Sequence, residues 1–193
     1  MNNNFLILSD IITNRRSIKP VNMDGRIIPD EQVRSLLELA DWAPTHGRTE
    51  PWRFLVYAGK KVKEFCRQHA ELYKTNKGSD YEHGVYDKTY HNGDNVSHLI
   101  VAYMQRGSLA KIPVLEEIVA TAAAVEHILL GATALGIANF LSTGGETHSQ
   151  MMKDFLQLRD EDVMIGIIYL GYTAATPVGK RSIPLDEKVK WLQ

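Results

Sequence analysis

The longest apolar run of the chain, from Ile118 to Leu141, constrains the fold more than any other stretch. A membrane-spanning helix needs roughly 20 apolar residues, so length alone would allow a span here. Glu126 and His127 interrupt the run, however, and its residues are mostly Ala, Gly and Thr rather than Leu and Phe. We therefore reject a membrane span and expect a buried element of a globular protein.

The spacing of Ala, Leu and Ile predicts a helix from Pro113 to Leu135, ended by Gly136 and followed by a short strand over 138–143. A helix that is apolar nearly all round must be buried all round. Small side chains along it, such as Ala123 and Gly131, would let another backbone approach closely. Two readings stay open, a core helix in a monomer and a core helix that also meets a partner subunit, and we favour the second.

Composition narrows the class of protein. A chain of 193 residues can bury a good core, and we expect one domain over residues 1–193. The net charge of −1, with no block of like charges, gives no indication of a nucleic-acid partner or a membrane surface. Cys66 is the only cysteine, which excludes an internal disulfide and fits a cytoplasmic location. The first residues lack the pattern of a signal peptide.

Strands and helices alternate loosely along the chain, which predicts helices on both faces of one sheet. The segment 75–95 is polar and is expected to be a mobile loop or short lid. The histidines lack metal-site spacing, so we expect no metal, and no G-x-G-x-x-G motif follows a strand. We expect strands at 53–58, 98–105, 138–143 and 163–172, and further helices at 5–13, 30–42, 60–73 and 147–156.

Three cations and a hydroxyl group follow the first helix, in the segment Arg15-Arg16-Ser17-Ile18-Lys19. In an extended segment alternate residues share a face, so Arg15, Ser17 and Lys19 would point one way and Arg16 and Ile18 the other. Such a face could clamp a polyanion such as a phosphate, for which Arg offers a bidentate fork. A solvated basic turn is the alternative.

Four motifs then line up in order. They are the basic segment 15–19, Ala43-Pro44 through Pro51-Trp52-Arg53-Phe54, Ala134-Leu135-Gly136 running to Ser142-Thr143-Gly144, and Ile168 to Tyr172 with Lys180-Arg181 behind. Together, over residues 7–189, they resemble the FMN-dependent nitroreductase family. The resemblance implies an α+β fold, a three-layer α-β-α sandwich with a mostly antiparallel sheet, built as an intertwined homodimer with FMN at the interface.

The resemblance also implies where FMN would bind. Arg15 and Ser17 would hold its phosphate and ribityl chain with Arg16 beside them, and Lys19 would approach the pyrimidine edge of the ring. A cation there would stabilise the negative charge of the reduced flavin near N1 and O2. The backbone N–H groups of Gly144 and Gly145 would lie near N5 and O4, because glycine permits close backbone approach. Further ring-lining positions are Leu141, Ser142 and Thr143.

Other implied contacts come from the C-terminal part and from a loop. Lys180 or Arg181 would complete the phosphate site, and the sequence leaves the choice between them open. His46 and Glu50 lie in the loop that would reach the flavin of the other subunit. Many members carry Asn and Gln at the places of Arg48 and Glu50, and a glutamate cannot donate a hydrogen bond as Gln does. His46 is equally compatible with a contact to backbone.

The function implied is that of an FMN-dependent NAD(P)H oxidoreductase, with NADH or NADPH as reductant. It would reduce a small-molecule acceptor, nitroaromatic or quinone-type, by ping-pong hydride transfer through flavin N5. Because the cofactor carries this chemistry, we name no catalytic side chain. Two alternatives stay open: another flavin reaction on the same scaffold, such as reductive dehalogenation or flavin modification, and a non-catalytic FMN-binding protein.

Overall fold

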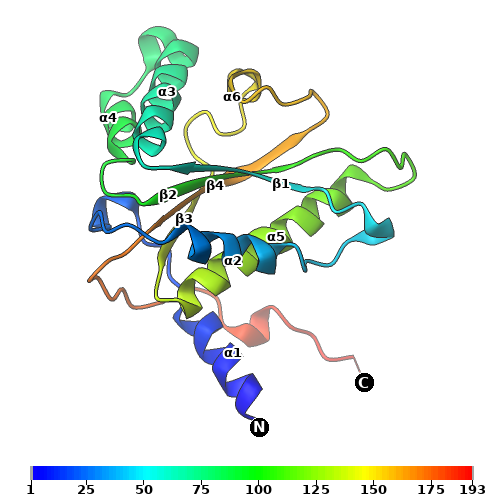
Figure 1. Cartoon of the computed structure of the whole chain (residues 1–193). Coiled ribbons are helices and arrows are strands. Elements are labelled where there is room, and N and C mark those ends of the chain that lie inside the picture. The colour runs from blue at the N-terminus through cyan, green and yellow to red at the C-terminus, as the bar shows by residue number, and fades with distance from the viewer. Residues whose placement is uncertain (1, 193) are drawn as a thin grey trace.

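A computed structural model describes residues 2–192, so Met1 and Gln193, the ends of the expected domain, lie outside the described residues. Its centre is a sheet in the order β1-β2-β4-β3, in which every neighbouring pair is antiparallel (Figure 1). The strands are β1 (Trp52–Ala58), β2 (His98–Met104), β3 (Ala138–Ser142) and β4 (Val163–Gly171). All four lie where the sequence predicts strands.

Helices cover both faces of this sheet (Figure 1). One layer holds α2 (Asp30–Ala40) and α5 (Val114–Ala134). The other holds α3 (Lys60–Lys77), α4 (His83–His91) and α6 (Gln150–Phe155), while α1 (Asn3–Asn14) projects beyond α5. Short 3-10 turns lie at Pro20–Asn22, His46–Arg48, Gly78–Asp80 and Leu185–Glu187. The expected α+β three-layer α-β-α sandwich is therefore confirmed.

The two inner strands, β2 and β4, are buried on both faces. Leu99, Ile100 and Val101 of β2 are fully buried, as are Ile167 and Ile168 of β4. Helices on both sides remove the solvent-facing positions that would otherwise give an apolar–polar alternation. This explains why both strands read as continuous apolar runs.

Helix α5 packs one face against the sheet and α2. A Cβ atom added to Gly131 would lie 2.8 Å from Leu39 Cδ1 and 2.9 Å from Leu36 Cδ2, so glycine is what permits the close approach of the two helices. The opposite face is open, with Leu115 at 67 % and Val119 at 59 % exposed. A single chain thus does not supply the all-round burial expected of this helix. Within residues 2–192, no helix is long and apolar enough to span a membrane.

The segment 75–95 corrects the sequence reading, because much of it is helical rather than a loop. Helix α3 continues to Lys77, and α4 follows after a short turn. Polar and aromatic contacts hold the two helices together: the Tyr86 hydroxyl donates to Glu71, 2.5 Å away, and the Arg67 guanidinium lies 5.3 Å from the centre of the Tyr90 ring. Apolar periodicity does not register contacts of this kind, which is why the sequence reading missed α4.

We predict that Gly131→Val will lower the free energy of unfolding by about 1–3 kcal/mol, the usual cost of overpacking a close-packed core. The added side chain would enter the space that Leu36 and Leu39 occupy. Denaturant unfolding measures the change. The matched control is Gly84→Val in α4, where an added Cβ meets nothing within 4 Å. That variant should stay within about 0.5 kcal/mol of the parent chain, and equal losses in both would contradict the packing argument.

Candidate functional site

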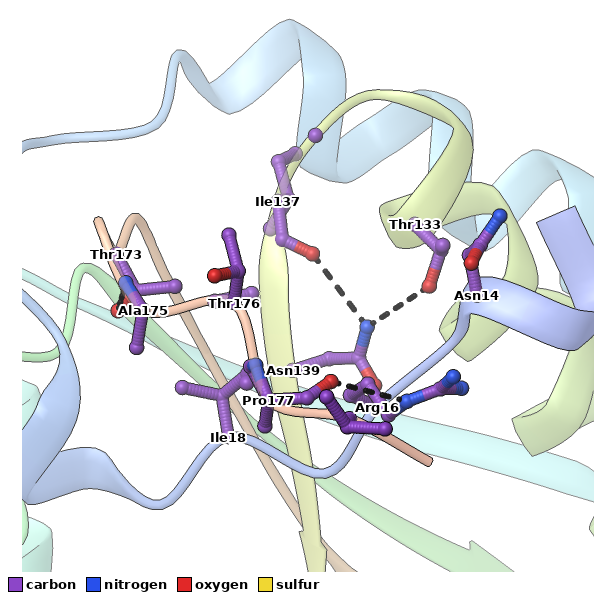
Figure 2. Close-up of a pocket in the computed structure, with 13 residues that line it drawn as sticks. Asn14, Arg16, Ile18, Thr133, Ile137, Asn139, Thr173, Ala175, Thr176 and Pro177 are labelled. Carbon is purple, nitrogen blue, oxygen red and sulfur yellow. Dashed lines mark hydrogen bonds between the residues drawn. The ribbon is translucent and has the colours of Figure 1, made fainter. Parts of the chain in front are cut away.

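The basic segment 15–19 runs alongside the edge strand β3. The Ile18 amide donates to the Asn139 carbonyl at 2.8 Å, and Ser17 forms an isolated parallel bridge with the same residue. This extended pairing sends alternate side chains to opposite sides. Arg16 and Ile18 line a hollow of about 580 Å³ with Pro177 (Figure 2), while Lys19 lines a different hollow.

The guanidinium of Arg16 donates hydrogen bonds to backbone carbonyls. Its Nη1 donates to the carbonyls of Thr13 (2.6 Å) and Arg15 (2.8 Å), and its Nε donates to the carbonyl of Pro177 (3.2 Å). The last contact joins the start of the chain to the C-terminal segment. The Arg16 side chain thus holds the segment at Pro177 and lines a different hollow from Lys19, while its expected place beside the phosphate stays a prediction.

Arg15 leaves the segment toward α5. Its Nε lies 3.9 Å from Glu126 Oε1, at the long end of an ion pair, and its side chain is partly buried. This also gives Glu126 a partner inside its own chain. His127 is likewise satisfied within the chain, because its Nδ1 lies 3.1 Å from the carbonyl of Leu39.

The end of β3 and the residues after it form a second site element. Leu141 to Gly145 line a hollow of about 300 Å³ together with Lys88 and Asn92. Lys19 lines an adjoining hollow of about 480 Å³, to which Lys88 and Asn92 also contribute. The predicted Lys19 and the predicted Leu141-Ser142-Thr143-Gly144-Gly145 stretch therefore line two hollows that meet at Lys88 and Asn92. We call these two hollows together the Lys88 surface.

The turn that carries Gly144 and Gly145 is held from within. The Thr147 hydroxyl donates to the Gly144 carbonyl at 2.6 Å, and Ser149 caps α6 by accepting the Met152 amide at 3.1 Å. Gly145 has a φ of +64°, a left-handed conformation that favours glycine. No hydrogen bond within residues 2–192 uses the amide of Gly144 or Gly145 as donor. Two backbone donors are therefore available at the Lys88 surface.

His46 and Glu50 lie elsewhere in the chain. His46 Nδ1 is 2.5 Å from Glu116 Oε2, near the start of α5. Glu50 lines a separate hollow with Trp52, and none of the residues of that hollow belongs to the Lys88 surface. Arg48 and Glu50 have φ values of +54° and +43°, a strained conformation for residues other than glycine. Within one chain, this loop does not contribute to the surface that carries Lys19.

Lys180 and Arg181 are both exposed. Arg181 Nη1 donates to the Lys180 carbonyl at 3.3 Å. Among the described residues, neither side chain makes a hydrogen bond with Arg15 or Ser17. The two cations follow directly on the segment that Arg16 holds, which keeps them at the same end of β3 as the basic segment.

Sequence reasoning missed Lys88, Asn92, His69 and Tyr169 as lining residues. Lys88 and Asn92 lie on or just after α4, which apolar periodicity did not reveal. Tyr169 was hidden inside a strand, and its burial raises the pKa of its hydroxyl. Burial also raises the pKa of the neighbouring Cys66 thiol to about 12, which makes a thiolate nucleophile there unfavourable. Across residues 2–192, no group of three or more His, Cys, Asp or Glu could hold a metal ion.

We predict that Arg16→Ala will release the C-terminal segment, because it removes the hydrogen bond to Pro177. Thermolysin should cleave the chain within residues 173–192 several times faster, and the free energy of unfolding should fall by about 1.5–3 kcal/mol, the scale of a hydrogen bond to a charged group. The control is Arg34→Ala, which removes an exposed guanidinium paired only with Glu38. Cleavage at the parent rate in Arg16→Ala would contradict the clamp.

Comparisons with known proteins concern the family and the fold of the chain. The model of the family described as "Nitroreductase family" matches residues 12–172. The protein named "Putative NAD(P)H nitroreductase YfhC" of Bacillus subtilis is 25 % identical over 183 residues, 94 % of this chain and 92 % of that protein.

Two solved structures show the same fold. A nitroreductase-like family protein from Bacillus cereus has a TM-score of 0.77 at 22 % identity, and covers 96 % of both chains. A nitroreductase with bound FMN from Desulfitobacterium hafniense has a TM-score of 0.69 at 18 % identity, and covers 100 % of both chains.

Proposed function

The chain belongs to the nitroreductase family, and from that premise we propose that it is an FMN-dependent NAD(P)H oxidoreductase that reduces nitroaromatic or quinone-type acceptors. One observation carries the proposal. The Lys88 surface brings Lys19, from the start of the chain, to the free amides of Gly144 and Gly145, which are far away in sequence. A cation and a pair of backbone donors on one surface suit a flat ring that gains negative charge on reduction.

The residues present fit FMN by their chemistry. When bound, FMN supplies hydride transfer at N5 between NADH or NADPH and a second substrate in ping-pong order. Lys19 stabilises negative charge at the pyrimidine edge of the ring, and the amides of Gly144 and Gly145 do so near N5 and O4. Arg15 and Ser17 bind the phosphate and ribityl chain, completed by Lys180 or Arg181. Leu141, Ser142 and Thr143 line the ring.

An intertwined homodimer completes this proposal. Helix α1 has no buried residue, although Phe5, Leu6 and Leu8 on it are apolar and about half exposed. Trp191, near the end of the chain, is 84 % exposed, and the outer face of α5 is also open. Monomers rarely expose so much contiguous apolar surface. A second copy would cover it, and would bring its His46 and Glu50 to the flavin of the first.

Another flavin reaction on the same scaffold remains the second candidate, and α4 is the observation that favours it. Val85, Lys88 and Thr89 of this helix line the hollow beside the Gly144–Gly145 turn. Substrate choice belongs to such a wall, which lies outside the residues assigned to the phosphate. Reductive dehalogenation or flavin modification would use the same cofactor contacts. Strained Arg48 and Glu50 are the basis of the third candidate, a non-catalytic FMN-binding protein.

A visible absorption spectrum of the purified protein tests the proposal. We expect two flavin bands that bleach on anaerobic addition of NADH or NADPH and return when a nitroaromatic or quinone is added. Bleaching without recovery on any such acceptor would favour dehalogenation or flavin modification. Bands that persist with both nicotinamides would favour the non-catalytic protein. Absence of bands after FMN is added and the protein desalted would contradict FMN binding altogether.

We predict that Arg15→Ala will weaken FMN binding by roughly 1.5–3 kcal/mol, the scale of a charge-assisted hydrogen bond to phosphate. Fluorescence titration of the apoprotein with FMN measures this. Lys61→Ala serves as the control, because Lys61 is an exposed cation beside Glu64 that lines neither the Lys88 surface nor the hollow of Glu50. An Arg15→Ala chain that binds FMN as tightly as the parent would show that the phosphate lies elsewhere.

A further inference from the structure

We propose that His69 is a positioning residue, which holds the Gly144–Gly145 turn so that its two free amides face the flavin. This inference rests on the proposed function and names a group that the turn depends on. His69 lies on α3, in the layer opposite α5. It is 2 % exposed and lines the same hollow as the turn.

Two contacts join His69 to the turn. The Glu146 amide donates to His69 Nε2 at 3.2 Å. Gly145 lies against the ring so closely that an added Cβ would be 2.9 Å from Nε2, and its φ of +64° disfavours a side chain in any case. The imidazole thus fixes the backbone on the residue directly after the two free amides.

The hydrogen bond defines the protonation state of His69. Because Nε2 accepts from an amide, the ring is neutral with its proton on Nδ1. Burial lowers the pKa of His69 to about 4, so the neutral form persists at physiological pH. Its Nδ1 is buried and has no hydrogen-bond partner among the described residues.

An unpaired buried N–H is unfavourable for folding. A leucine would fill this position, between Phe65 and the turn, without an unpaired polar atom of its own, but it would leave the buried amide of Glu146 without its acceptor. Histidine satisfies that amide and leaves its own Nδ1 unpaired. What histidine alone contributes is the acceptor that binds the Glu146 amide, which links its presence to the turn.

A second tether supports the first. The Glu146 side chain is also buried, and its Oε2 accepts from Asn76 Nδ2 at 2.8 Å. Asn76 lies near the end of α3, so both tethers come from one helix. Because His69 and Asn76 both hold Glu146, the turn keeps its two free amides oriented before any ligand arrives. Preoriented donors stabilise developing negative charge more than mobile ones do.

Measuring the two-electron midpoint potential of bound FMN in His69→Leu and His69→Gln tests the proposal. In His69→Leu the turn loosens, and we expect the reduced flavin to lose about tenfold in relative affinity, which lowers the potential by about 30 mV. Gln places an amide oxygen near the position of Nε2 and should recover at least half of this shift. The matched control is His83→Leu on α4, an exposed histidine that forms an ion pair with Asp87 and lines none of the hollows of the Lys88 surface.

Two results would overturn the positioning role. One is a His69→Leu potential equal to that of the parent; the other is a Gln variant shifted as far as Leu, which would mean that packing and not the acceptor matters. If His69→Leu fails to fold, exposed Asn76→Ala carries the test through the second tether. An unchanged potential there would likewise overturn it. A parent chain that binds no FMN would instead refute the proposed function, so the two failures are distinguishable.

Discussion

The hydrogen bond from the Ile18 amide to the Asn139 carbonyl joins the basic segment to β3, and the candidate site depends on it. Strand β3 in turn pairs with β4 over five residues, which fixes its position at the edge of the sheet. Strand β3 therefore orients two parts of the candidate site. One is the basic segment 15–19, which pairs with β3, and the other is the Gly144–Gly145 turn, which follows β3 in sequence. Neither would have a defined position relative to the other without this edge.

Helix α5 explains why an edge strand can be so well placed. The chain passes from α5 into β3 through Gly136, whose φ of +68° allows the sharp change from helix to strand. The inner face of α5 is anchored by Ile128 and Leu129 in the core it shares with α2. Its outer face stays apolar and open, which costs solubility in a lone chain. That cost is offset once a second copy covers it, so the sequence of α5 serves both the core and the proposed interface.

The sequence predicted the elements whose stability comes from apolar burial. Helix α5 was found from its helical apolar spacing, and the four strands were found from their apolar, β-branched and aromatic content. Helix α4 was missed because Tyr86, Tyr90 and Arg67 hold it through aromatic and ionic contacts. For the site, alternation along 15–19 separated Arg16 and Ile18 from the other face. It could not reveal that three carbonyls occupy Arg16, because one of them belongs to Pro177 and is distant in sequence.

Several unfavourable features of the chain lie at the proposed flavin contacts. Arg48 and Glu50 adopt left-handed conformations, which cost about 1–3 kcal/mol each for residues other than glycine. His69 keeps an unpaired Nδ1 in the interior. Most of the remaining core is apolar and well packed, so the fold does not need these features for its own stability. Strained or unsatisfied groups often persist where they orient a functional group. Here Arg48 and Glu50 lie in the loop assigned to the partner's flavin, and His69 contacts the turn assigned to N5. Their location supports the same site that Lys19 and the glycine amides define.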